Sequence, residues 1–96
     1  MPALTKDEVK ARLQNLEGWK PDGDEIEKKF AFADFKASMA FVNRVAELAN
    51  AADHHPDISI KYNRVKLTLS THSEGGVTEN DFALATQIDA AAQPSG

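Results

Sequence analysis

The three histidines of this 96-residue chain are the side chains best suited to acid–base chemistry. His54 and His55 are adjacent in the stretch ADHHPDISI, and His72 follows in LSTHSEGG. Because histidine titrates near pH ~6.5, its ring can give or accept a proton under ordinary conditions. Two or three such rings around one ligand would suit general acid–base catalysis. A nucleophilic role for Ser70 or Thr71, by contrast, rests on their proximity to His72 alone.

Two carboxylates are expected beside these histidines. Pro56 disfavours helical backbone at the residue before it, so the helix that leads to the histidine pair must end near Asp53–His54. Asp81 falls in the first turn of the last predicted helix, and the loop SEGGV returns the chain from His72 to that helix. We therefore expect both aspartates to lie near the imidazoles.

The segment between the histidines predicts a β-hairpin. DISIKY and VKLTLST alternate apolar and polar side chains, and a two-residue turn at Asn63–Arg64 is plausible because Asn tolerates positive φ. Counting eight residues outward from each side of that turn places His55 opposite His72. This register predicts that all three imidazoles meet at one edge of the sheet.

Each of these residues also has another explanation. Imidazole is a common zinc ligand, but neighbouring side chains on an extended segment diverge, and no HExxH helix is present. His54 could interact favourably with the dipole at the C-terminal end of the helix, which would explain one histidine and not three. Thr78-x-x-Asp81 resembles a capping box, and on residue type alone we favour capping for Asp81. For Trp19 we favour burial in the core over stacking on a ligand.

The apolar pattern predicts one α+β domain over residues 1–96, with a frayed tail at 93–96. Two antiparallel hairpins imply a four-stranded antiparallel sheet with helices packed on one face. The expected order is α-β-β-α-β-β-α, with helices at 5–16, 34–52 and 78–92 and strands around Trp19 and at 25–32, 57–62 and 65–71.

The long helix carries a broad apolar arc, which suggests contact with more than one element. Its partners could be the sheet and a neighbouring helix, or the sheet and another subunit, and both remain open. The edge strand of an open sheet could also pair with the same strand of another copy. The main stripe of the helix is Phe35, Met39, Val42 and Ala46, widened by Phe41, Val45 and Leu48.

Composition narrows the classes of function. A net charge of −4, from 15 acidic and 11 basic residues, argues against a nucleic-acid-binding surface. No apolar run approaches the ~20 residues that span a bilayer, and the start MPALTKDEVK lacks the features of a signal peptide, so we expect a cytoplasmic location. The absence of cysteine excludes disulfides and thiolate chemistry.

Long stretches of this sequence resemble the pterin-4a-carbinolamine dehydratase family. The resemblance runs from the first helix to about Ile88 and includes GW at 18–19 and FAFADFKASMAFVNRVA at 30–46. It is densest in DHHPDISIKYNRVKLTLSTH and the following GGVTENDFALATQID. The specific signature is the spaced set His54-His55-Pro56, Tyr62, His72 and Asp81.

The resemblance implies an enzyme that dehydrates 4a-hydroxytetrahydropterin to quinonoid dihydropterin, which recycles the cofactor of aromatic amino-acid hydroxylases. His54 and His72 would form the acid–base pair, with the two roles unassigned, and His55 would mainly hold the pterin. Neither a metal nor an organic cofactor is required. Family members join sheets across dimers and often build tetramers through the long helix, so a homodimer or homotetramer is expected. Further contacts to the pterin or the imidazoles would come from Asp53, Ser70, Thr71 and Asp81.

The sequence departs from the family pattern at two positions. We expect these departures to affect the rate and the affinity for substrate more than the class of reaction. Asn50 stands where many relatives carry a glutamate, and Ile58 stands where an aromatic residue is frequent. The alternative function is a non-catalytic protein-binding module, since family members also serve as dimerisation cofactors for a homeodomain transcription factor. A metal-binding protein is a third hypothesis.

Overall fold

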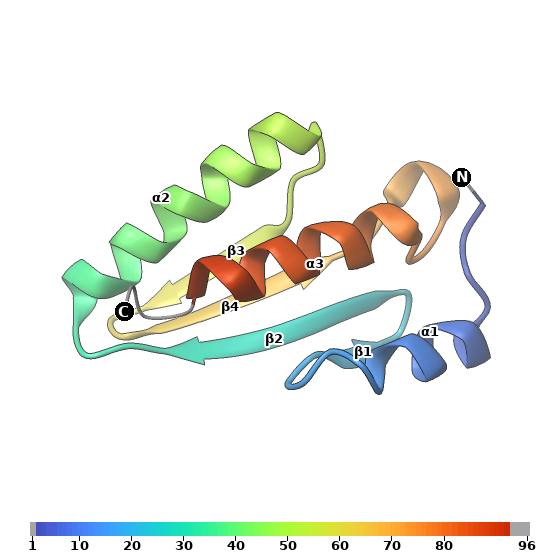
Figure 1. The fold of residues 1–96 in the computed structure, drawn as a ribbon, viewed down its shortest axis with the longest axis horizontal. Helices are drawn as coiled ribbons and strands as arrows, with labels where there is room; N and C mark the ends of the chain where they lie inside the picture. The colour runs from blue at the N-terminus through green and yellow to red at the C-terminus, as the bar shows by residue number, and fades with distance from the viewer. Residues whose placement is uncertain (1, 93–96) are drawn as a thin grey trace.

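The computed structural model describes residues 2–92, and its element order confirms the predicted α+β fold (Figure 1). All strand pairs are antiparallel, and the sheet order β1-β2-β4-β3 joins the two hairpins through their inner strands. The predicted tail at 93–96 lies outside the described residues. The elements are α1 (Lys6–Leu13), β1 (Lys20–Asp22), β2 (Glu25–Ala31), α2 (Phe35–Ala52), β3 (Asp57–Lys61), β4 (Arg64–Leu69), the 3-10 turn η1 (His72–Glu74) and α3 (Glu79–Ala92).

The first two helices begin where their capping residues predict. The Thr5 hydroxyl accepts from the Glu8 backbone N–H at 3.1 Å, and the Glu8 carboxylate accepts from the Thr5 N–H at 2.9 Å. These bonds lower the pKa of Glu8, with the backbone N–H of Thr5 as the largest cause. At α2, the Asp34 carboxylate accepts from the Ala37 N–H at 2.8 Å.

The core lies between one face of the sheet and the two longer helices. Figure 1 shows α2 and α3 on the same side of the sheet. Alternation along β2 and β4 sends every second side chain toward these helices. No helix within residues 2–92 is long and apolar enough to cross a bilayer. The fully or nearly fully buried side chains include Ile26, Val65, Leu67 and Leu69 from the sheet, Phe41 and Val45 from α2, and Leu84, Ala85 and Ile88 from α3.

The residues of the broad apolar arc on α2 are not equally buried. Phe41 and Val45 are fully buried, whereas Phe35 is 49 % exposed and Ala46 is exposed. The core contact of α2 is therefore centred on Phe41 and Val45, the residues that widen the predicted arc, with Val42 partly buried beside them. Apolar surface is left on the outer side of α2.

The β3–β4 turn lies one residue earlier than predicted. Lys61 pairs with Arg64, so the turn residues are Tyr62 and Asn63, and Tyr62 takes the left-handed φ of 53°. Asn63 is fixed by β2: its side-chain amide donates to the Phe32 carbonyl at 3.0 Å, and its own carbonyl accepts from the Phe32 N–H at 2.8 Å. This tertiary contact decides the register, and the sequence of the turn does not reveal it.

The new register changes which residues lie across from each other. The ladder ends at Asp57 paired with Thr68, and its continuation places His55 opposite Ser70. The predicted pairing of His55 with His72 is therefore wrong. His72 lies beyond the strand, in the single turn of η1.

Trp19 connects the N-terminal segment to α3. Its indole N–H donates to both carboxylate oxygens of Asp89, at 3.0 and 3.1 Å, and the Lys28 ammonium lies 2.9 Å from the same carboxylate. The ring is 4 % exposed and meets Phe30 edge-on, with ring centroids 6.3 Å apart. The predicted burial of Trp19 in the core is confirmed.

Candidate active site

The adjacent histidines lie directly after α2, as Pro56 predicts. Asp53 caps the helix with a left-handed backbone, φ 50°, and its N–H donates to the carbonyls of Ala49 and Asn50. The His54 N–H then donates to the Ala49 carbonyl at 3.1 Å. This closed turn holds the backbone of His54 against the last turn of α2 before β3 begins.

His54 is bound to a buried carboxylate. Its Nε2 atom hydrogen-bonds Oδ1 of Asp81, a residue in the first turn of α3. The Asp81 side chain has no exposed surface, and that of His54 is 15 % exposed. A carboxylate can only accept here, so the bond assigns the hydrogen to Nε2 and leaves Nδ1 as the ring atom free for chemistry.

The second oxygen of Asp81 is held by two threonines. Oδ2 accepts from the Thr71 hydroxyl and from the Thr78 backbone N–H, both at 2.9 Å. The two threonine hydroxyls are also 2.8 Å apart, and the Thr78 hydroxyl accepts from the Asn80 N–H at 3.2 Å. Asp81 therefore both caps α3, as favoured on residue type, and supports His54.

His55 turns to a different partner. Its Nε2 atom lies 3.0 Å from Oδ1 of Asn50, one turn back on α2, and the ring is exposed. The residue that departs from the family pattern thus contacts the second histidine directly. An amide oxygen accepts a hydrogen bond without bringing a negative charge to the imidazole.

His72 lies in an open hollow of about 390 Å³ beside the β1–β2 turn. Ser70 lines the same hollow, and its hydroxyl donates to the Asp24 carbonyl at 3.0 Å. The backbone N–H of Thr71, the residue before His72, donates to the Gly76 carbonyl at 2.9 Å, which fixes the start of η1. Within residues 2–92, no hydrogen bond joins His72 to either of the other histidines.

The site is built from segments far apart in sequence. The structure brings together His54, Thr71 and Asp81, and it places His55 with Asn50 at the end of α2. Thr78 was missed by sequence reasoning as a part of this network, because its capping signal gives no sign that the hydroxyl is fully buried against Thr71. No three His, Asp or Glu side chains of the described chain are grouped so that they could hold a metal ion.

These features define a small α+β protein with a carboxylate-supported imidazole at one end of its sheet. The chain belongs to the family described as Pterin 4 alpha carbinolamine dehydratase, which it matches over residues 2–91. This membership confirms the resemblance drawn from the sequence.

Relatives and solved structures agree with this assignment. A protein of Acidobacterium capsulatum, provisionally named a pterin-4-alpha-carbinolamine dehydratase, is 54 % identical over 90 residues, which cover 94 % of this chain and 98 % of the relative. The crystal structure of a transcriptional coactivator/pterin dehydratase from Brucella melitensis superposes with a TM-score of 0.90 at 42 % identity, covering 95 % and 99 % of the two chains. A pterin dehydratase-like RuBisCO assembly factor of the alpha-carboxysome gives a TM-score of 0.70 at 29 % identity, covering 83 % and 95 %.

Proposed function

We propose that this protein dehydrates 4a-hydroxytetrahydropterin to quinonoid dihydropterin and water. The observation that carries the proposal is the buried Asp81 behind His54, in a chain of the pterin dehydratase family. In the reaction the C4a–O bond breaks and the hydroxyl leaves as water after it takes a proton from an acid. The proton on N5 passes to a base, and its bonding pair forms the C4a=N5 double bond. No electron acceptor is consumed.

His54 is the central acid–base residue in this proposal. Asp81 holds Nε2–H, so Nδ1 of His54 can accept a proton and return it while the ring keeps one orientation. A carboxylate held by three donors also stabilises the imidazolium formed when the ring is protonated. His72 supplies the complementary proton transfer, and the assignment of acid and base between the two rings stays open.

The remaining residues hold the pterin or position the histidines. His55 contacts the pterin and is oriented by Asn50. Ser70 lines the hollow beside His72 and is available to the ring system, while Asp53 lies exposed at the helix end. Asp81 and Thr71, expected from the sequence to contact substrate, are better suited to act through His54, because Asp81 is fully buried and the Thr71 hydroxyl is bonded to it.

An absorbance assay with freshly generated 4a-hydroxytetrahydropterin tests the proposal. The wild-type protein should accelerate formation of the quinonoid product, and His54→Ala should lower kcat by about 10²–10⁴-fold. Asn43→Ala, an exposed change on α2, serves as the control that keeps full activity. Equal rates for His54→Ala and Asn43→Ala would refute an acid–base role for His54.

A second candidate is a protein-binding role, which exposed apolar side chains favour. Phe35 on α2 is 49 % exposed, and Ile58 and Ile60 on the edge strand β3 are 39 % and 37 % exposed. A homodimer or homotetramer would cover such a surface, and so would another protein. The variant His54→Ala/His72→Ala separates the two functions. A protein-binding scaffold would keep the mass of its native assembly and still bind its partner, whereas the dehydratase would lose turnover.

A further inference from the structure

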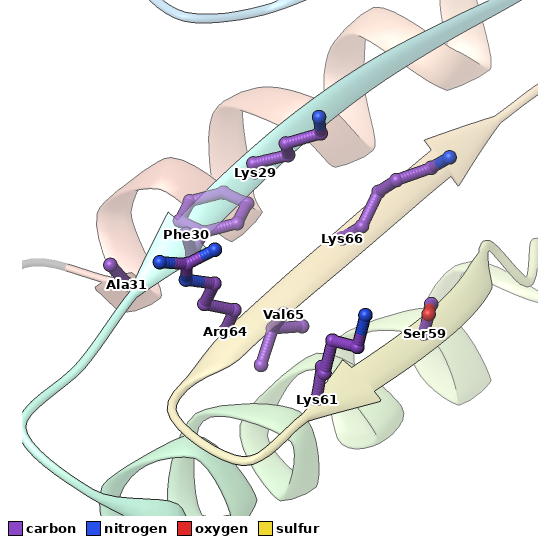
Figure 2. Close-up of a pocket in the computed structure, with 8 residues that line it drawn as sticks. All are labelled: Lys29, Phe30, Ala31, Ser59, Lys61, Arg64, Val65 and Lys66. Atoms are coloured by element: carbon purple, nitrogen blue, oxygen red, sulfur yellow. The ribbon is translucent and has the colours of Figure 1, made fainter.

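The helix-free face of the sheet carries a group of cations that the candidate active site does not use. In the strand register, Lys29 on β2 lies directly opposite Lys66 on β4, and Lys61 on β3 lies directly opposite Arg64 on β4. Residues paired in this way share one face of the sheet. Figure 2 shows that the four side chains rise from three neighbouring strands around one hollow.

The two like-charged pairs do not stabilise the fold. Like charges directly opposite each other destabilise a sheet, and here two such pairs follow one another. Lys66 is partly compensated by Glu27, at 3.4 Å. Among residues 2–92, no carboxylate lies within ion-pair distance of Lys29, Lys61 or Arg64. A chain with a net charge of −4 thus keeps a local excess of positive charge without a folding reason for it.

The opposite end of the same face is acidic. Asp22 pairs with Glu25 there, and Asp57 begins β3 on the same side, across from Thr68. An anion approaching this face is repelled at one end and attracted at the other. The basic end adjoins the β3–β4 turn, whereas His54 precedes the start of β3, so the cationic hollow is separate from the candidate active site.

The spacing of the cations matches a small ligand. Neighbouring strands lie about 4.8 Å apart, and alternate residues along one strand are about 6.8 Å apart. The hollow has a volume of about 550 Å³, and Ser59 adds a hydroxyl to its wall. An Arg guanidinium binds a phosphate or carboxylate in bidentate fashion, and lysines supply point charges around it.

We propose that this hollow binds a compact polyanion, a small molecule that carries two or more phosphate or carboxylate groups. Arg64 binds one anionic group, and the charges of the other groups are neutralised by Lys29, Lys61 and Lys66. Binding relieves the repulsion between the two like-charged pairs. The site is independent of pterin chemistry, and its variants keep the dehydratase rate of the wild type.

A titration followed by the backbone amide NMR spectrum tests the proposal, with pyrophosphate and citrate as separate probes and NaCl at matched ionic strength as the reference. We expect saturable shifts confined to residues 29–31 and 59–66. Arg64→Gln and Lys66→Gln should each weaken binding about tenfold, the size of one charge-assisted hydrogen bond. Lys20→Gln, on the same sheet face but opposite Glu27, should leave affinity unchanged.

The two probes identify the kind of anion. Saturation by pyrophosphate alone supports a phosphate ligand, by citrate alone a polycarboxylate, and by both a polyanion of either type. Shifts spread evenly over all lysines, no saturation with either probe, or an equal loss of affinity in Lys20→Gln would overturn the proposal. Because the dehydratase assay is read separately, failure of the anion site and failure of the proposed function are distinguishable.

Discussion

Replacing Asp81 with asparagine tests whether this carboxylate acts through His54 or only caps α3. In the structure Oδ2 accepts from Thr71 and Thr78, and Oδ1 accepts from His54. The amide of Asp81→Asn has a single acceptor oxygen. If that oxygen keeps the two threonine donors, the NH₂ group replaces Oδ1 and faces Nε2 of His54. The ring must then present a lone pair at Nε2 and carry its hydrogen on Nδ1, the atom to which the proposed function assigns the proton transfer.

The cost in stability follows from the lost negative charge, because all three hydrogen bonds to residue 81 then join neutral groups. A hydrogen bond to a charged group contributes about 1.5–3 kcal/mol, and we expect the weakening summed over the three bonds to be of this size. For a chain of this size, a loss of that magnitude lowers Tm on the order of 10–20 °C. Circular dichroism should therefore show a folded variant with a lower Tm, and kinetics are measured at a temperature where both proteins are fully folded.

The effect on catalysis is larger than the effect on binding. Fixing the wrong tautomer removes most of the acid–base contribution, so kcat should fall about 10²–10⁴-fold. KM should change by less than about threefold, because Asp81 is fully buried and the proposed function gives it no contact with the substrate. Thr71→Val is the matched comparison: it removes one donor to Oδ2 but keeps the carboxylate facing His54, so Tm falls while kcat stays within about tenfold.

The absorbance assay with 4a-hydroxytetrahydropterin decides between the two roles. If Asp81→Asn loses stability but keeps kcat within about twofold of the wild type, Asp81 is a helix cap and the reasoning about His54 is refuted. A fall in kcat equal to that of Thr71→Val would also contradict it, since the tautomer argument applies to the carboxylate alone.

Three further predictions concern other parts of the molecule. Asn50→Ala removes the acceptor for His55 Nε2 and should raise KM about fivefold with little change in kcat, measured by steady-state kinetics. Trp19→Phe removes the N–H that bonds Asp89 and should lower the free energy of unfolding by about 1–2 kcal/mol in urea. Glu8→Gln keeps a capping acceptor but loses the charge. Because the folded-state pKa of Glu8 is lowered from 4.5, the wild type should be more stable than this variant above about pH 4.5, and the difference should vanish as the pH falls through the lowered pKa.

Two of these changes have a matched control variant, and the third has an outcome that would contradict it. Asn43→Ala alters an exposed asparagine on the same helix and should leave KM unchanged; an equal rise in both variants would remove the case for Asn50. An unchanged urea midpoint in Trp19→Phe would show that the indole bond contributes nothing. Glu17→Gln removes an exposed carboxylate outside α1, and a pH-dependent difference in Tm equal to that of Glu8→Gln would contradict the role given to the capping box.

The fold was predictable because local signals and apolar patterning agreed. The capping box at Thr5, the N-cap at Asp34 and the Pro56 signal each placed a helix boundary correctly. The alternation in residues 25–32 and 57–69 gave the antiparallel strands. The register of the second hairpin was wrong because it depends on the bonds between Asn63 and Phe32, which join residues 31 positions apart.

The candidate site was predictable in its residue types more than in its geometry. Sequence reasoning named His54 and Asp81, and the structure brings them into contact through two helix ends. Sequence reasoning named these two residues even though the predicted pairing of His55 with His72 is wrong. The contact arises because α2 and α3 lie side by side, a packing relation that no local pattern records.

The different roles that we propose for the adjacent histidines rest on the two acceptors that they contact. His54 turns inward to a buried carboxylate, and His55 turns outward to a neutral amide on the exposed surface of α2. A carboxylate stabilises a protonated ring, whereas an amide oxygen only orients it. A glutamate at position 50 would give both rings a negative partner. With Asn50, only His54 has one, and for this reason the proposed function gives the proton chemistry to His54 and substrate binding to His55.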